Sequence, residues 1–347
     1  MQVIRLAVKY QQNPLRVARG LSYVNVAMHD AWLQCLGLPL NLAELAAHRA
    51  AALVIEQLYA NETPGQFEAQ FALFELALSQ QLRQQPDALA VGVAVGSALI
   101  ERSLHDGSSR IWSPKDRPAP FAGVWQPTYP MYAANPAEGY ASQWQPWITR
   151  PTHRYQPPRA ARPGSVQHAD ETREVLAVSR TLTEGNKQAA RRWHLDAGSV
   201  TPAGVWLRLT LDELDADASG WSMDRAFPVL AAVSVAMHDA FIECWRVKMR
   251  DWSERPVTAV RRELDASFVP LLVTPGFPGY VSAHATVSAA AATVLAHFWP
   301  GHRTRFEALA EEAAMSRLWG GIHFRSDNDE GLLLGRGVGA EVVARLT

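Results

Sequence analysis

Cysteine, excess charge of one sign and long apolar runs are all scarce in this sequence of 347 residues. Two cysteines are too few for a disulfide scaffold or for a zinc site built from thiolates. With 33 basic against 34 acidic residues, the chain lacks the strong positive charge of nucleic-acid binders. No run of about 18 apolar residues predicts a membrane span, and the start lacks the apolar core of a signal peptide. These absences favour a globular protein without a nucleic-acid partner.

The chain nevertheless holds enough apolar residues for a large core. Hydrophobic residues make up 48% and charged residues 19%, which predicts a packed protein instead of a disordered one. At roughly 150 residues per domain, the length suits about two domains or one large fold. We expect a soluble protein whose location is open. It is cytoplasmic as the sequence stands, and periplasmic or secreted if an N-terminal leader precedes it.

One short segment occurs twice. Residues 24–32 read VNVAMHDAW and residues 233–241 read VSVAMHDAF, and Cys35 and Cys244 each follow six residues after the histidine of their copy. Two copies so far apart predict a pair of related helical units, not a solenoid. We expect the cysteines to be buried thiols. We expect both His-Asp pairs to be structural, because adjacent residues on a helix point in different directions.

Apolar residues recur at helical spacing along most of the chain, and no alternating run predicts a strand. The candidate helices include 43–60, 66–84, 86–105, 224–248, 283–298, 303–319 and 328–346. The exception is 108–165, which holds many prolines and the tryptophans Trp112, Trp125, Trp144 and Trp147. Such a segment predicts an irregular connection lying on the helices.

The expected fold is therefore all-α, within one compact structural domain. An N-terminal helical half spans 1–107, the Pro/Trp-rich connection spans 108–165, and a C-terminal helical half spans 166–347. The C-terminal half carries the charged residues described next, and the N-terminal half is expected to lack an anion site. When the two copies of the repeat are aligned on their histidines, Pro39 falls opposite Lys248 and Ala46 opposite Arg255.

Polar side chains of complementary kinds gather in the C-terminal third. They are Lys248 and Arg255 in KMRDWSERP, Ser282, Ala283 and His284 in VSAH, and Arg317, His323 and Asp327 in SRLWGGIHFRSD. Arginine forks match adjacent oxygens and lysine adds a compact charge, so the set suits a tetrahedral oxyanion. Ser282 at a helix N-cap would direct free N–H groups toward that anion. Of two histidines, one can bond to the central atom while the other moves protons.

Each of these residues also has an ordinary structural explanation. Any one of the cations alone could be a solvated surface charge. Ser316 suits a packing hydroxyl. Asp327, three residues before Glu330, also fits a capping box for the last helix. The joint order and spacing favour the binding site.

That order resembles the superfamily of vanadium-dependent haloperoxidases and type 2 phosphatidic acid phosphatases. Its motifs are Lys-(x)6-Arg-Pro, Pro-Ser-Gly-His and Ser-Arg-(x)5-His-(x)3-Asp. The first and third are met in full, whereas Val281 replaces the proline and Ala283 the glycine of the second. Nearly the whole chain resembles the bacterial haloperoxidases. The resemblance implies two pseudo-symmetric four-helix bundles, in agreement with the internal repeat.

The resemblance also implies a cofactor, vanadate, and a role for each residue. The vanadate oxygens would be held by Lys248, Arg255, Ser282, Arg317 and the backbone N–H of Ala283. His323 would be the axial vanadium ligand, His284 the acid–base group, and Asp327 is counted with Lys248 among the catalytic residues. Phe277 and Trp245 would line the halide pocket, which makes chloride oxidation a hypothesis beside bromide oxidation.

The reaction implied is oxidation of the halide by hydrogen peroxide. The hypohalous product would halogenate or oxidise a small organic acceptor. A homodimer is a further implication of the resemblance. One alternative is a soluble acid phosphatase without vanadate, in which His323 forms a phosphohistidine, Asp327 orients it and His284 protonates the leaving group. The other is a non-catalytic oxyanion-binding or scaffold protein.

Overall fold

The computed structural model describes residues 2–59, 80, 85–149, 155–217 and 222–346. In that part the chain forms α-helices and no β-strand, which confirms the all-α prediction. The α-helices are α1 (Gln2–Lys9), α2 (Pro14–Gln34), α3 (Leu40–Tyr59), α5 (Pro86–His105), α6 (Val166–Arg180), α7 (Glu184–Arg192), α8 (Thr201–Ala216), α9 (Met223–Asp251), α10 (Pro256–Glu263), α11 (Ala283–Phe298), α12 (Arg303–Trp319) and α13 (Arg325–Val343). The helix expected at 66–84 lies outside the described residues apart from position 80.

The chain divides into two compact units. The first comprises residues 1–108 and 196–235, and the second comprises 109–195 and 236–347. Helix α9 therefore begins in the first unit and ends in the second. The three-part division expected from the sequence stays a prediction.

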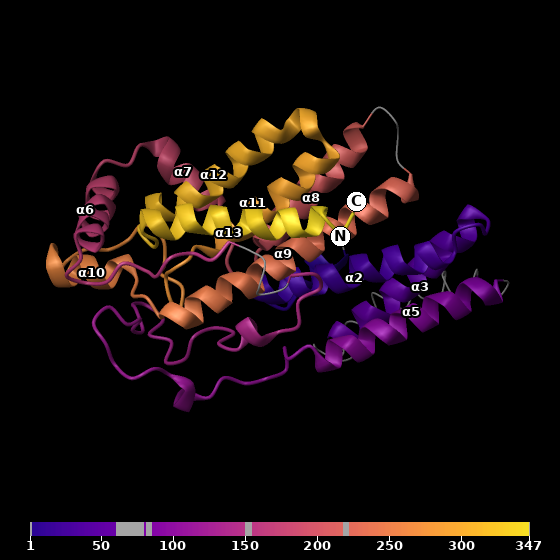
Figure 1. Ribbon diagram of the computed structural model, residues 1–347, viewed down its shortest axis with the longest axis horizontal. Helices are drawn as coiled ribbons and strands as arrows, with labels where there is room; N and C mark the ends of the chain where they lie inside the picture. Colours follow the sequence, from indigo (N-terminus) through magenta and orange to yellow (C-terminus); the bar gives the residue numbers. More distant parts are fainter. Residues whose placement is uncertain (1, 60–79, 81–84, 150–154, 218–221, 347) are drawn as a thin grey trace. The chain divides into compact units, whose positions relative to one another are not determined.

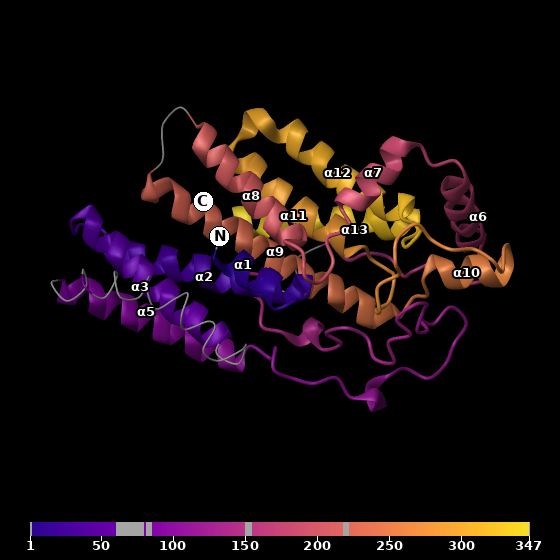
Figure 2. The same ribbon diagram turned by 180° about the vertical axis from the view of Figure 1, so that it is seen from behind.

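Small residues let the helices of the first unit approach closely. Helices α2, α3 and α5 lie side by side (Figure 1, Figure 2). A Cβ atom added to Gly92 of α5 would lie 2.7 Å from the carbonyl oxygen of Ala46 in α3. Asn13 begins α2, because its side chain accepts hydrogen bonds from Leu15 N and Arg16 N. This unit holds the first copy of the repeat, in α2.

Close packing of the same kind joins α11 to α13 in the second unit (Figure 1). A Cβ atom on Gly335 would lie 2.1 Å from the carbonyl oxygen of Thr286, and one on Gly331 would lie 2.9 Å from that of Ser282. These contacts tolerate no side chain at either glycine. They hold the first turn of α11, where Ser282 lies, against the first turns of α13.

The connection from 109 to 149 is irregular, with short 3-10 turns at Pro114–Asp116 and Ala141–Gln143. It is anchored to α9 and the residues just after it. Trp125 is fully buried, and its backbone N–H donates to the backbone carbonyl of Trp252 at 2.7 Å. Further along, the carboxylate of Asp239 accepts the backbone N–H groups of residues 147, 148 and 149.

Both cysteines are buried free thiols, as the sequence predicts. Among the described helices, α5 and α9 are long and apolar enough, by length and composition alone, to cross a membrane. The apolar window of α9 is 94% buried, as expected of a core helix, and that of α5 is 28% buried. These signals are weak and do not argue for a membrane span.

Candidate active site

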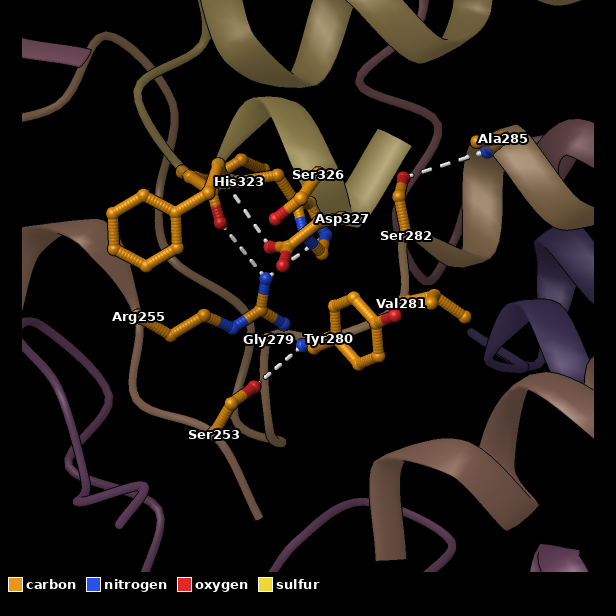
Figure 3. Close-up of polar contacts among 12 residues, drawn as sticks. Ser253, Arg255, Gly279, Tyr280, Val281, Ser282, Ala285, His323, Ser326 and Asp327 are labelled. Carbon is orange, nitrogen blue, oxygen red and sulfur yellow. Dashed lines mark hydrogen bonds and ion pairs between the residues drawn. The ribbon is translucent and has the colours of Figure 1, made fainter. Parts of the chain in front are cut away.

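The site residues predicted from the sequence all lie in the second unit. Lys248 and Trp245 are on the last turns of α9, and Arg255 is the N-cap of α10. Ser282 is the N-cap of α11, and Arg317 is on the last turn of α12. The chain then turns at Gly320 and Gly321, where Gly321 has a φ of 73° that favours glycine. His323 and Asp327 follow, at the start of α13 (Figure 3).

Lys248 fixes the loop that leads to α11. Its Nζ donates to the carbonyl oxygens of Pro278 at 2.9 Å and Gly279 at 2.7 Å. The side chain has no exposed surface, and this burial lowers the pKa of Lys248 to about 7. The same loop is held by Ser253, whose Oγ accepts from Tyr280 N at 2.7 Å. A buried ammonium is therefore placed by backbone carbonyls.

Arg255 bridges that loop and the segment carrying His323 (Figure 3). Its Nε donates to the carbonyl of Phe277 at 2.9 Å, and its Nη1 donates to that of Ile322 at 2.9 Å. The same Nη1 lies 3.0 Å from Nε2 of His323. Since a guanidinium can only donate, His323 Nε2 is the acceptor and carries no proton.

His323 is consequently a neutral imidazole with its proton on Nδ1. That nitrogen lies 2.7 Å from Oδ2 of Asp327, and this carboxylate oxygen accepts a hydrogen bond from the Nδ1–H group. Burial, followed by the charges of Arg255 and Lys248, holds the pKa of His323 well below its usual range. A lone pair on Nε2 in a fixed direction is the form of histidine that binds metals.

Asp327 connects three parts of the site. Besides His323, its Oδ2 accepts from Phe324 N at 3.2 Å, and its backbone carbonyl accepts from Ser282 N at 2.7 Å. Burial raises the pKa of Asp327 to about 7, while the charges of Lys248 and Arg255 act in the opposite direction. One residue thus fixes the imidazole and the N-cap of α11.

The start of α11 presents Ser282 and Ala283. The Ser282 hydroxyl accepts from Ala285 N at 3.4 Å, which makes it the N-cap expected from the sequence. Ala283 is the first helical residue, and it is absent from the residues with positive φ. The backbone at this position therefore does not require glycine.

Arg317 and His284 complete the polar set. Arg317 is 2% exposed, and its Nη2 donates to the carbonyl of Ala190 in α7 at 3.2 Å. Ser316 donates to the carbonyl of Ala313 at 2.6 Å, the bond of a packing hydroxyl. Burial, followed by the Arg317 charge, holds the pKa of His284 well below its ordinary value. Nε2 of His284 is buried and has no hydrogen-bond partner among the described residues.

Two aromatic rings lie against the cations. The ring centroids of Trp245 and Phe277 are 5.0 Å apart. Lys248 Nζ lies 5.2 Å from the Phe277 centroid, and Arg255 Cζ lies 4.9 Å from it. The indole N–H of Trp245 donates to the carbonyl of Ala137 in the irregular connection. An apolar wall therefore adjoins two positive charges, at distances typical of cation–π contacts.

The sequence did not indicate several groups that hold this arrangement. They are the backbone carbonyls of Ala190, Phe277, Pro278, Gly279 and Ile322, and the side chains of His168, Glu171 and Glu254. Only Glu254 had a usable signal, because it directly precedes Arg255 in the first motif.

Comparison with known proteins gives one family and one fold. A model of the VCPO second helical-bundle domain matches residues 300–347, the segment that holds Arg317, His323 and Asp327. The structure described as that of the first bacterial vanadium-dependent iodoperoxidase is 26% identical, with a TM-score of 0.80 over 100% of this chain and 94% of that one. No curated protein sequence matches the chain significantly.

Two structures of bacterial vanadium-dependent chloroperoxidase share the fold. The holo form is 15% identical, with a TM-score of 0.74 over 95% of this chain and 91% of that one. The apo form is 14% identical, with a TM-score of 0.72 over 94% of this chain and 92% of that one.

Proposed function

We propose that this chain, which belongs to the vanadium-dependent haloperoxidases, oxidises a halide with hydrogen peroxide in the pocket around His323. The observation that carries the proposal is the fixed protonation of His323. Its Nδ1 proton is committed to Asp327 at 2.7 Å, so that Nε2 is left as an electron-pair donor beside the Arg255 guanidinium. A metal held as an oxyanion needs both a donor nitrogen and positive charge at the same place.

The donor set fits vanadate. Lys248, Arg255 and Arg317 are all buried, and burying positive charge costs free energy that a bound anion offsets. The hydrogen bonds of Lys248 go to carbonyl oxygens, so its charge is not neutralised by them. His284 adds a buried nitrogen that makes no hydrogen bond to the described residues. When bound, vanadate supplies the Lewis acidity that activates peroxide without a change of redox state.

Each residue then has a proposed task. Nε2 of His323 would bind the vanadium, and the Arg255 Nη1 would then leave that nitrogen and donate to the vanadate oxygens. The remaining oxygens would be held by Lys248, Arg317, the Ser282 hydroxyl and the Ala283 N–H. Neutral His284 would accept and return a proton through Nε2. Lys248 would also supply positive charge that polarises hydrogen peroxide in the pocket.

The wall formed by Trp245 and Phe277 is the proposed halide site. Its rings adjoin Lys248 and Arg255, so a halide there would meet positive charge on one side and an apolar surface on the other. We propose that the enzyme oxidises bromide and that it also oxidises chloride. The chloride proposal is abandoned if the enzyme brominates but never chlorinates. The hypohalous product would pass to a small organic acceptor.

A paired assay on one preparation tests the function. Metal-free protein, with and without orthovanadate, is given hydrogen peroxide, bromide and a dione dye, and separately a chromogenic phosphate ester. We expect bromination that depends on vanadate and is lost in His323→Ala. Phosphate hydrolysis that vanadate inhibits, without bromination, would overturn the proposal in favour of the phosphatase. The absence of both activities would point to a non-catalytic scaffold protein. The comparisons do not favour these two alternatives.

A further inference from the structure

Helix α6 (Val166–Arg180) packs its buried face against the elements that carry the site. His168, Thr172 and Val175, which recur at helical spacing, are at most 2% exposed. Val175 lies in one apolar cluster with Val257 of α10 and Leu318 of α12. Figure 1 and Figure 2 show α6 beside α10 at one end of the second unit. The helix is therefore fixed relative to the segments that begin and end the binding site.

The first polar contact of α6 fixes the residue before Arg255. His168 Nε2 lies 3.0 Å from Oε1 of Glu254, and both side chains are buried. The Arg262 guanidinium neutralises Glu254 from the other side, with Nη2 at 2.7 Å from Oε1. The backbone of Glu254 is held as well, since its N–H donates to the carbonyl of Gly123 at 2.8 Å. These bonds set the position of α6 one turn before Glu171.

The second contact supplies an acceptor to the start of α13. Both oxygens of Glu171 are used: Oε1 accepts from Ser326 N and Oε2 from Ser326 Oγ, each at 3.0 Å. The first N–H groups of a helix have no partner within it, and a side chain at the N-cap usually provides one. Here the N-cap is Phe324, whose side chain has no acceptor atom. Glu171 therefore caps α13 from another helix.

This cap adjoins the residue that orients His323. Asp327 follows Ser326 directly, and its Oδ2 already serves His323 Nδ1 and Phe324 N. His168 and Glu171 also line one small cavity of about 10 Å³. Asp327 and Tyr280 are among the other residues that line it. A cavity of that size has room for about one water molecule.

We propose that Glu171 is a positioning residue of the anion site. By satisfying the start of α13, it leaves the Asp327 carboxylate to hold His323 with Nδ1 protonated and Nε2 toward the anion. Without Glu171, the Ser326 N–H competes for Asp327, and the imidazole loses its fixed orientation. This inference rests on the proposed function, because it concerns how the same site binds vanadate. Partners that orient a ligand through another residue typically change metal affinity about 10- to 100-fold.

The test measures vanadate binding to the metal-free protein by equilibrium dialysis. We expect Glu171→Ala to weaken binding about tenfold, and Glu171→Gln, which keeps an acceptor oxygen, to lose only about threefold. The matched control is Glu174→Ala. Glu174 lies on the same helix and binds Arg325 of the same partner helix, but that pair is part-exposed and does not cap α13. Its loss should leave vanadate affinity unchanged.

A spectroscopic readout separates orientation from stability. In protein labelled with ¹⁵N-histidine, two-bond ¹H–¹⁵N correlations report which nitrogen of His323 carries the proton, and the His323→Ala spectrum assigns the signals. Glu171→Ala should weaken the Nδ1–H pattern without vanadate present, whereas Glu174→Ala should not. If Glu171→Ala does not fold, Glu171→Gln replaces it, and this variant must bind vanadate more weakly than Glu174→Ala.

The outcomes distinguish the two proposals. Wild-type protein that binds vanadate and brominates, with Glu171 variants equal to it in affinity and histidine spectrum, overturns the positioning role and leaves the function intact. Wild-type protein that neither binds vanadate nor brominates overturns the function itself. Equal losses in Glu171→Ala and Glu174→Ala would assign the effect to general loosening of α6, and would also overturn the positioning role.

Discussion

The two copies of the repeat have nearly the same sequence and very different surroundings. In α9, the side chains of His238 and Asp239 are 2% and 0% exposed. In α2, those of His29 and Asp30 are 24% and 44% exposed. Helix α2 ends at Gln34, whereas α9 continues to Asp251 and so reaches Lys248. The motif therefore specifies a helix, and the residues beyond it decide whether that helix serves a site.

The anchoring function differs in the same way. Asp239 accepts backbone N–H groups from residues 147, 148 and 149 and so fixes the irregular connection. The Asp30 carboxylate instead lies 3.1 Å from Nδ1 of its neighbour His29. A repeated sequence thus makes a long-range anchor in one copy and a local pair in the other.

The largest effect should come from removing the cation that only the second copy carries. We expect Lys248→Ala to lower kcat/KM for bromination at least about 100-fold, because one buried donor to the anion is lost. Pro39, the aligned position of the first copy, is exposed, and Pro39→Ala should leave kcat/KM unchanged. Steady-state kinetics with vanadate in excess measure both. Equal losses in the two variants would break the comparison.

The second effect concerns stability. Asp239→Ala leaves three backbone N–H groups without their acceptor, one at a buried and two at part-buried positions, and should lower the free energy of unfolding by about 3 kcal/mol. Asp30→Ala removes a part-exposed carboxylate, and should change it by less than about 0.5 kcal/mol. Urea unfolding followed by circular dichroism compares the two variants. Similar values would mean that burial does not distinguish the copies.

A smaller effect should appear in the pH dependence of anion binding. Because burial lowers the pKa of Lys248 to about 7, its charge is present below that pH and lost as pH rises through it. Asp327, with its pKa raised to about 7, gains negative charge over the same interval. Both changes weaken anion binding as pH rises, by up to about tenfold per unit for each group.

Tungstate is a suitable probe, because its own charge does not change between about pH 6 and about pH 9, the interval in which these groups titrate. Calorimetric titration of the wild type should show falling affinity across that interval. Lys248→Arg, which keeps its charge throughout, should show a shallower fall. Affinity that is flat or rising in the wild type would contradict the prediction.

The smallest effect is expected where the two copies agree. Burial raises the pKa of both Cys35 and Cys244, so neither should react quickly with a thiol reagent in the native protein. Both should react after denaturation. Rapid reaction of one equivalent in the native state would show that the copies differ here too, and Cys35→Ser would identify which thiol is accessible.

Much of the fold, and some local features of the candidate site, could be predicted from the sequence. Helical spacing predicted the helices, and spacing with residue type predicted Ser282 as the N-cap of α11. The turn after Arg317 followed from Gly320 and Gly321. These features depend on neighbours within a few positions, and local sequence records such neighbours.

The contacts that orient the site could not be predicted in this way. Lys248 and Arg255 are placed by backbone carbonyls 22 to 67 positions away, which carry no signature in residue type. Glu171 contacts Ser326 across 155 positions. On the sequence alone, Glu171 is one more charge on a polar stretch of helix. Its task appears only when α6 and α13 are placed together.

The bond from Arg255 to His323 has a consequence for which metals the protein admits. A neutral histidine with a fixed lone pair would attract zinc or copper ions. Here a guanidinium lies 3.0 Å from that lone pair, and its positive charge repels any approaching cation. An anion meets the opposite force, since it attracts the guanidinium away from the nitrogen. We therefore expect the arginine to disfavour a bare metal cation at this nitrogen and to favour a metal that is bound as an oxyanion.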